Sequence, residues 1–297
     1  MSRYLDPRAD VVFKKIFGDH PHLLMSFLNA VLPLPADSPI VELRYLPSEQ
    51  VPVIPEFKRT IADVKCRDSQ NRVFIVEMQM NWTDTFKQRL LFGTSQAFVK
   101  QLEKGRGYVF LEPVYGLGLV ADIYDTLTPD WYHHYQLVKK GSHDGDVIDY
   151  LQLIFIELPK FPVHSQDEKK LRLLWLRFLR EINENTHTVS EELLAVPEIS
   201  EAVELAEESA YSKTELEFYD SYWDQVRREK TLMSDKYNEG KAEGKAEGKA
   251  EGKAEGQIQI AKNMLGLNLA VAVIASATGL TEKEIEHLKI EAGDIRQ

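Results

Sequence analysis

Two short segments that lie close together in the chain, residues 60–66 and 73–80, constrain its fold most strongly. Both segments are rich in β-branched and apolar residues, and a turn-forming run, Asp68-Ser-Gln-Asn71, separates them. This combination predicts two antiparallel strands joined by a tight turn. We expect a three-residue loop at 69–71, and the loop length determines which residues face each other across the hairpin.

The predicted register brings polar side chains together on one face of the hairpin. It pairs Asp63 with Glu77, Lys65 with Ile75 and Ile61 with Gln79. Side chains alternate along a strand, so Glu77 and Gln79 share a face, and Asp63 shares a face with Lys65 on the partner strand. The opposite face of the second strand is apolar and carries Phe74, Val76 and Met78.

Two carboxylates that stand directly opposite each other, here Asp63 and Glu77, destabilise a pair of strands. Their presence indicates either a bound cation or a raised pKa of one carboxyl group. Mg²⁺ is usually bound by one or two carboxylates together with water and substrate phosphate. Both residues are therefore candidate ligands for Mg²⁺, with Mn²⁺ as the alternative ion.

The segments around the hairpin predict an α/β core with a mixed central sheet, followed by a C-terminal helical extension. Helical spacing of apolar residues occurs at 10–17, which ends at Gly18, and again at 23–31 and 85–104. Strand-like segments are found at 41–46, 108–122 and 147–157.

The second half of the chain changes character after residue 165. We expect a core over 1–165, an acidic helical extension over 166–235, a linker over 236–256 and a small helical tail over 257–297. Within the tail we expect short helices at 257–265 and 269–277, and a third that begins with a capping box of Thr281 and Glu284. The linker repeats Gly-Lys-Ala-Glu four times, and a glycine in every helical turn predicts a mobile or marginally helical segment. The alternative is a glycine stripe through which two copies form a homodimer.

The charge distribution indicates where a polyanion could bind. The net charge is -11, which disfavours a nucleic-acid partner for the chain as a whole. Residues 1–110 nevertheless hold 15 Lys and Arg against 12 Asp and Glu, whereas the remainder holds 21 against 35. The tail carries four basic residues against five acidic ones, so self-association or docking is favoured there over DNA binding.

Composition also excludes several classes of protein. The single cysteine, Cys66, cannot form a disulfide framework or a cysteine zinc site within one chain. No run of about 18 apolar residues predicts a membrane span, and the first residues lack an apolar signal core. We therefore expect a cytoplasmic protein with no membrane partner. His133 and His134 are adjacent, so on a strand they would point to opposite faces and would not bind one metal ion.

An ordered set of motifs resembles the PD-(D/E)XK nuclease family transposases, also called recombination-promoting nucleases. The set comprises Asp10-Val-Val-Phe-Lys-Lys-Ile-Phe17, Asp63, Val76-Glu77-Met78-Gln79, Arg89 with the helix to Gln101, Gly107-Tyr108 and Ile156-Glu157-Leu158-Pro159-Lys160-Phe161. The glycine repeat and Thr278-Gly279-Leu280 are similar to the C-termini of that family.

The resemblance implies a restriction-endonuclease-like fold over residues 1–165 and a Mg²⁺-dependent DNA endonuclease associated with mobile elements or recombination. Asp63 matches the family's motif Asp, and Glu77 matches its second acidic ligand. Gln79 stands where the parent superfamily has Lys, and Asp10 matches the acidic residue that the first helix often contributes. Lys65 is either the missing cation of the site or a solvated strand lysine.

Two functions follow from these residues. The favoured hypothesis is an active nuclease with Asp63, Glu77, Gln79, Lys65 and Asp10 as its catalytic residues. The alternative is a catalytically degenerate DNA-binding or assembly module of the same fold, because the motif Lys is missing and the C-terminal half is acidic. The residues support hydrolysis of phosphodiester bonds and do not specify the DNA sequence or structure that is cut.

Overall fold

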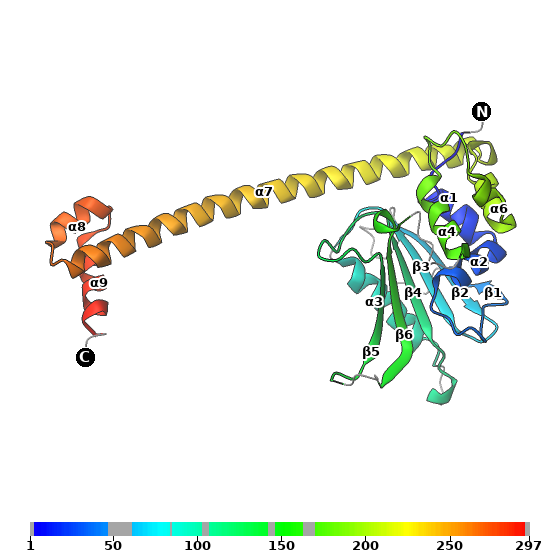
Figure 1. Ribbon diagram of the computed structural model, residues 1–297, viewed down its shortest axis with the longest axis horizontal. Coiled ribbons are helices and arrows are strands. Elements are labelled where there is room, and N and C mark those ends of the chain that lie inside the picture. Colours follow the sequence, from blue (N-terminus) through cyan, green and yellow to red (C-terminus); the bar gives the residue numbers. More distant parts are fainter. Residues whose placement is uncertain are drawn as a thin grey trace. The chain divides into compact units, whose positions relative to one another are not determined.

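The predicted hairpin lies inside the central sheet in the computed structural model of the protein (Figure 1). Strands β2 (Ile61–Asp68) and β3 (Val73–Gln79) pair antiparallel, with Asp63 opposite Glu77. The structure describes residues 3–46, 61–83, 85–102, 107–141, 146–162 and 170–294, and their side chains except those of 61–63 and 291–294.

The turn between these strands is held by the buried side chain of Asp68. Its Oδ1 accepts hydrogen bonds from the backbone amides of Gln70 at 3.0 Å and Arg72 at 2.9 Å, and its Oδ2 accepts one from Arg72 Nε at 2.7 Å. Asn71 adopts a φ of 64°, a left-handed conformation that Asn tolerates. These contacts hold the three-residue loop, and the predicted register is confirmed.

The described residues form one mixed sheet of six strands in the order β1-β2-β3-β4-β6-β5. The remaining strands are β1 (Leu43–Tyr45), β4 (Val114–Val120), β5 (Tyr132–Val138) and β6 (Val147–Glu157). β3, β4 and β6 run parallel, whereas β1 and β5 join antiparallel at the edges. The predicted mixed sheet is confirmed, but the strand expected over 108–122 begins at Val114. β5 is mostly exposed, so it lacks the apolar periodicity that would predict it.

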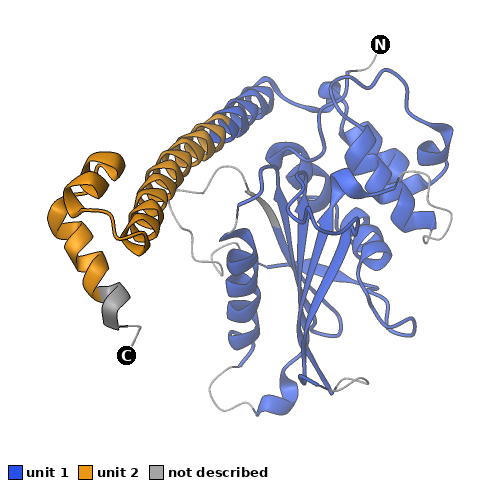
Figure 2. Cartoon of the chain, turned by 60° about the vertical axis from the view of Figure 1, so that its left-hand side comes forward, with its two compact units in different colours: residues 1–230 blue, residues 231–297 orange. Residues whose placement is uncertain are grey.

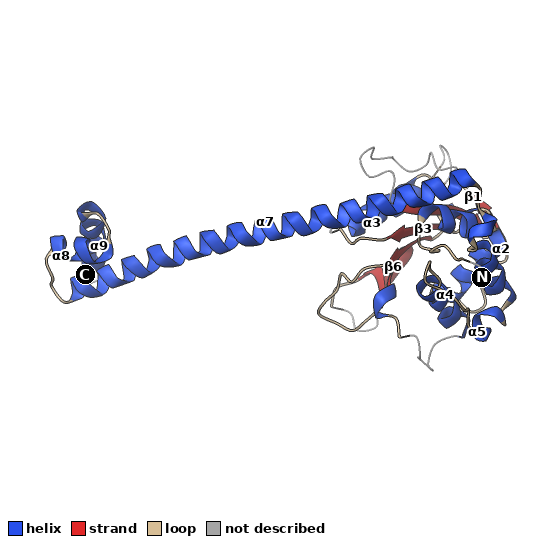
Figure 3. Ribbon diagram, turned by 90° about the horizontal axis from the view of Figure 1, so that it is seen from above, coloured by secondary structure: helices blue, strands red, loops and turns tan. Residues whose placement is uncertain are grey.

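Helices cover both faces of the sheet, as Figure 1 and Figure 3 show. α3 (Thr85–Val99) connects β3 to β4 and packs on one face, and it is shorter than the predicted helix over 85–104. The other face is covered by α1 (Asp10–Phe13), the π-helical turn η1 (Lys14–Gly18), α2 (Pro21–Val31), α4 (Lys170–Glu181) and α6 (Pro197–Leu205). Short helical segments lie between these elements at η4 (Tyr108–Phe110), η5 (Leu158–Lys160), α5 (Glu191–Leu194) and η6 (Glu208–Ala210).

The acidic helices that follow residue 166 share a core with the N-terminal helices. Trp175 of α4 is fully buried and contacts the rings of Phe17 and Phe27 at 5.6 and 5.8 Å between centroids. Its indole Nε1 donates a hydrogen bond to Ser26 Oγ at 3.1 Å. One compact unit accordingly covers residues 1–230, so residue 165 is not a boundary between compact units (Figure 2).

The second compact unit covers residues 231–297. α7 (Lys213–Gly266) begins in the first unit and continues through the repeat, whereas the glycine content predicts a mobile or marginally helical linker. Lys, Ala and Glu favour helix, and residues on both sides of the repeat already pack as helix, so the cost of nucleation does not fall on the repeat itself. The segment 257–265 is the end of α7 and does not form a separate helix.

The tail is built around a small apolar core of its own. α8 (Val271–Thr278) and α9 (Glu282–Asp294) contribute the buried residues Ile274 and Ile285, which pack with Ala261. The predicted capping box of α9 is present, because Thr281 and Glu284 exchange side-chain to backbone hydrogen bonds at 2.7 and 3.3 Å. None of the helices in the described part of the chain has the length and hydropathy of a membrane span.

Candidate active site

The two predicted metal ligands meet across the hairpin. Asp63 of β2 and Glu77 of β3 are direct partners in the register. Glu77 is 6% exposed, and its strand is buried on both faces. The backbone of Asp63 is described, whereas its side chain lies outside the described residues. A buried carboxylate beside a second acidic position is an arrangement that needs positive charge nearby.

That positive charge comes in part from Arg89 of α3. Its Nε lies 3.6 Å from Glu77 Oε2, and its Nη2 donates a hydrogen bond to Gln79 Oε1 at 2.6 Å. Gln79, which is 4% exposed, in turn donates from Nε2 to the carbonyl oxygen of Asn81 at 2.7 Å. Glu77, Gln79 and Arg89 therefore form one connected polar group at the end of β3.

Sequence reasoning did not assign a function to Arg89, although a signal is present. Arg89 follows Phe86 by three positions and directly precedes Leu90, so it stands beside the apolar stripe of α3 that packs on the sheet. Its guanidinium carbon lies 5.1 Å from the centre of the Phe86 ring. The signal for a functional role of Arg89 is a cation placed next to the buried stripe of the helix that follows the motif strand.

The first turns of α7 contact the same end of β3. Asn81, two residues beyond Gln79, donates from Nδ2 to the carbonyl oxygen of Val226 at 3.2 Å, and Asn81 is 9% exposed. Val226 is also buried, and both residues belong to the first compact unit. A helix from the acidic part of the chain thus supports the loop that carries the acceptor for Gln79.

Lys65 and Asp10 occupy different surroundings. Lys65 is 6% exposed on β2, so the alternative of a solvated strand lysine is wrong. Asp10 begins α1, which packs against β2 in the layer on the sheet face opposite to α3. Its Oδ1 forms an ion pair with Lys14 Nζ at 2.8 Å.

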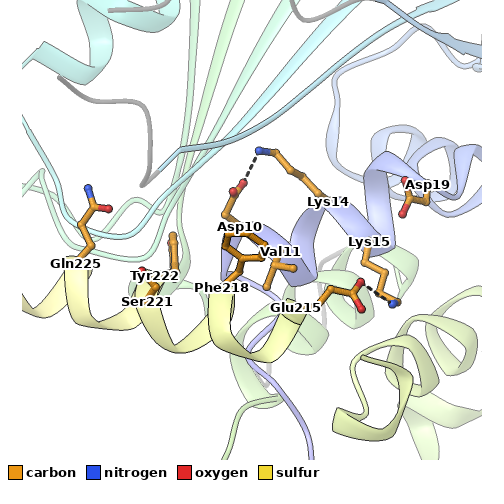
Figure 4. Close-up of a pocket in the computed structure, with 10 residues that line it drawn as sticks. All are labelled: Asp10, Val11, Lys14, Lys15, Asp19, Glu215, Phe218, Ser221, Tyr222 and Gln225. Atoms are coloured by element: carbon orange, nitrogen blue, oxygen red, sulfur yellow. Dashed lines mark hydrogen bonds and ion pairs between the residues drawn. The ribbon is translucent and has the colours of Figure 1, made fainter. Parts of the chain in front are cut away.

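Asp10 lines a cavity of about 540 Å³ between the N-terminal helices and the first turns of α7 (Figure 4). The other polar groups on its wall include Lys14, Lys15, Glu215 and Gln225. Burial and the nearby Asp10 carboxylate raise the pKa of Tyr222, which also lines the cavity. The wall of the cavity therefore carries both acidic and basic groups, and Asp10 is paired there with Lys14.

A second buried carboxylate lies on the same row of the sheet as Gln79. In the register, Gln79 is paired with Val120 and Val120 with Glu157. Glu157 is fully buried and accepts hydrogen bonds from Lys160 Nζ at 2.9 Å and from the backbone amide of Tyr124 at 3.0 Å. Its Oε1 also lies at hydrogen-bond distance, 2.8 Å, from His133 Nε2. Lys160 also donates to the carbonyl oxygens of Thr128 and Asp130, so this cluster holds the loop between β4 and β5 in place.

The adjacent histidines do not share a ligand. His133 contacts Glu157, whereas His134 Nε2 lies 2.9 Å from Gln152 Oε1. The two rings therefore have separate hydrogen-bond partners. Among the described side chains, which exclude that of Asp63, no group of three His, Cys, Asp or Glu residues could hold a metal ion.

Asp63 and Glu77 together are a donor set that fits Mg²⁺ better than Zn²⁺. Mg²⁺ needs one or two carboxylates with water and phosphate completing its shell. Zn²⁺ sites use three or four protein ligands, mostly His and Cys, and the nearest basic side chain to Glu77 on α3 is a guanidinium that cannot coordinate a metal.

Comparison with known families agrees with this geometry. The sequence model of the PD-(D/E)XK nuclease family transposases matches residues 7–235. The chain belongs to this family. No curated protein and no solved structure matched the chain.

The residues matched by the family model agree with the extent of the first compact unit. The match ends at residue 235, close to the unit boundary after Lys230, and includes the helices from α4 to the start of α7. The family domain thus comprises the mixed sheet and the helical layer together. It is the domain of a nuclease family linked to transposition.

Proposed function

We propose that this protein is a metal-dependent DNA endonuclease that hydrolyses phosphodiester bonds, with Asp63 and Glu77 as ligands of Mg²⁺ or Mn²⁺. The observation that carries the proposal is the register of the hairpin, which places the two acidic residues opposite each other, together with the partly buried guanidinium of Arg89 on α3 beside Glu77. A bound ion of this kind lowers the pKa of water and stabilises the charge that develops on an attacked phosphate.

The remaining residues of the site act around the two carboxylates. Lys65 is buried on the same strand as Asp63 and offsets the negative charge of the acidic pair. Gln79 holds its neighbours in place through the hydrogen bonds of its amide. Asp10 belongs to the helical layer on the other face of the sheet, where it pairs with Lys14, and it is proposed to contribute the acidic group of the first helix. Each of these groups positions substrate or ligands, and none replaces Asp63 or Glu77.

DNA is the proposed substrate, and cleavage is proposed to serve mobile elements or recombination. Support comes from the family and from the excess of basic residues in the first 110 residues. The tail and the repeat are proposed to bring two copies together as a homodimer, because the tail has its own core and little net charge.

The deciding experiment is cleavage of supercoiled plasmid in Mg²⁺ by the wild-type chain and by Asp63→Ala and Glu77→Ala. We expect both variants to lose measurable cleavage while remaining folded, because each loses a proposed metal ligand. Glu42→Ala is the matched control, since the side chain of Glu42 is 53% exposed and pairs with exposed Arg44. It should cut at the wild-type rate.

The contrary result is equally clear. If Asp63→Ala and Glu77→Ala both cut at the unmodified rate, and a mock purification contains no nuclease, the assignment of the site is wrong. A wild-type chain that binds DNA without cutting it would instead support the catalytically degenerate DNA-binding or assembly module.

A further inference from the structure

The amide of Gln79 is oriented by two neighbours, one that accepts a hydrogen bond and one that donates a hydrogen bond. The carbonyl oxygen of Asn81 can only accept a hydrogen bond, so it requires the NH₂ group of Gln79 at 2.7 Å. The guanidinium of Arg89 can only donate, so it requires the oxygen of Gln79 at 2.6 Å. Both demands select the same orientation of the amide.

A lysine at position 79 could not satisfy both neighbours. A Lys ammonium has three donors and no acceptor, so it could bind Asn81 but would face the Arg89 guanidinium with like charge. The hydrogen bond to Asn81 fixes the Gln79 amide so that its oxygen faces Arg89. Gln in place of the superfamily Lys is therefore chemically consistent with a cation that comes from α3.

Arg89 has donor capacity beyond its contacts with the hairpin. A guanidinium carries five N–H donors on three nitrogens in a planar fork. Nη2 contacts Gln79, and Nε faces Glu77. The side chain is 20% exposed, so the group is neither sealed in the core nor free in solvent. A planar fork with remaining donors matches two oxygens of a phosphate.

We propose that Arg89 binds the phosphate that is attacked and so takes the role of the missing motif lysine. Gln79 is the residue that positions Arg89. This inference rests on the proposed nuclease function and deepens it. The guanidinium stays charged at any working pH, and Glu77 and Gln79 hold it at the acidic pair. Arg89 would therefore meet the phosphate without first having to be ordered.

The alternative for Arg89 is a purely structural role as the counter-charge of buried Glu77. Arg89→Lys separates the two roles, because it keeps the positive charge but loses the planar fork. A structural counter-charge predicts unchanged kcat for this variant. Phosphate binding predicts that kcat falls about 10²-fold, in line with the loss of one preorganised donor group, while thermal stability and the affinity for a DNA duplex in EDTA stay near wild type.

The experiment measures kcat and KM on plasmid in Mg²⁺ for the full chain and for Arg89→Lys, Arg89→Ala and Gln79→Lys. Arg44→Lys is the control, since the side chain of Arg44 is 81% exposed. We expect methylguanidinium, but not methylammonium, to restore part of the activity of Arg89→Ala. Gln79→Lys should lower kcat about as much as Arg89→Lys, because it removes the acceptor of the guanidinium.

Each outcome supports or overturns the inference. A wild-type kcat in Arg89→Lys overturns it. So does an Arg89→Ala variant whose activity falls only as much as its folded fraction and is not restored by methylguanidinium. Wild-type or raised kcat in Gln79→Lys overturns the positioning role. If the wild-type chain cuts, Asp63→Ala does not, and Arg89→Lys cuts normally, this inference fails while the nuclease function stands. A wild-type chain that never cuts refutes the proposed function itself.

Discussion

The close packing of α3 on the sheet can be tested with a single methyl group. Gly118 of β4 lies under α3, and a Cβ at this position would stand 2.9 Å from Phe155 Cδ1 and 3.0 Å from Phe86 Cε1 and Cζ. Both rings are buried at 1% exposure or less and meet edge to face with centroids 5.7 Å apart. Both rings are packed on all sides, so both have to shift to accommodate Gly118→Ala, and a shift of Phe86 moves α3 with it.

The magnitude follows from the cost of overpacking. Forcing an extra methyl group into a well-packed core costs about 1–3 kcal/mol. In a unit of this size, 1 kcal/mol corresponds to roughly 2–4 °C in Tm. Arg89 lies three residues after Phe86, so a shift of α3 also moves its guanidinium away from Gln79. A misplacement of about 1 Å can reduce turnover about 10²-fold, so kcat should fall at temperatures where the variant is fully folded.

Gly93 provides the matched control on the same helix. A Cβ at Gly93 meets no atom within 4 Å, so Gly93→Ala should stabilise α3 by about 0.5–1 kcal/mol. Urea denaturation of both variants gives the free energies of unfolding, and plasmid cleavage at 25 °C gives kcat. Equal stability of Gly118→Ala and Gly93→Ala, or normal kcat in Gly118→Ala, would refute the reasoning that α3 is held against the sheet by this glycine.

Three further results are expected. Trp175→Ala should lower the free energy of unfolding in urea by about 3–5 kcal/mol, because it empties a fully buried site; a loss below about 1 kcal/mol contradicts this. Deleting residues 240–297 should preserve metal-dependent cleavage by the first unit, and a folded truncated protein without any cleavage would contradict that. The Ser212 amide and hydroxyl, with Lys15, lower the pKa of Glu215 to about 2 from 4.5, so the stability that Glu215 contributes is present at neutral pH and is lost as pH falls through this range. Stability curves of wild type and Glu215→Gln should accordingly converge toward pH 2; a constant gap would argue against these contacts.

The hairpin could be predicted from sequence because its information is local. The loop at 69–71 has turn residues at the positions that need them, and alternation of apolar residues sets the faces of both strands. Together they determine that Asp63 faces Glu77, and the register agrees. The helical segment of the first motif, an α-helical turn followed by a π-helical turn, and the capping box at Thr281 depend on equally local signals and are also present.

Other features depend on contacts between distant parts of the chain. The acidic composition of 166–235 predicts helices but not that Trp175 fills the core beneath α2. The exposed strand β5 has no pattern of its own, and it exists because β6 offers it an edge for pairing. In the repeat, the intrinsic cost of glycine favours an irregular linker, whereas the packed segments at both ends favour continuation of α7.

The sequence by itself determined the acidic pair, its position on a hairpin and the family to which the chain is similar, because turn chemistry and side-chain alternation act over a few residues. The tertiary structure decided which groups surround that pair. Arg89 reaches Gln79 only because the crossover from β3 to β4 lays α3 on the sheet and Gly118 lets it approach closely. Such a contact depends on the packing of whole elements, and no pattern within either segment alone encodes it.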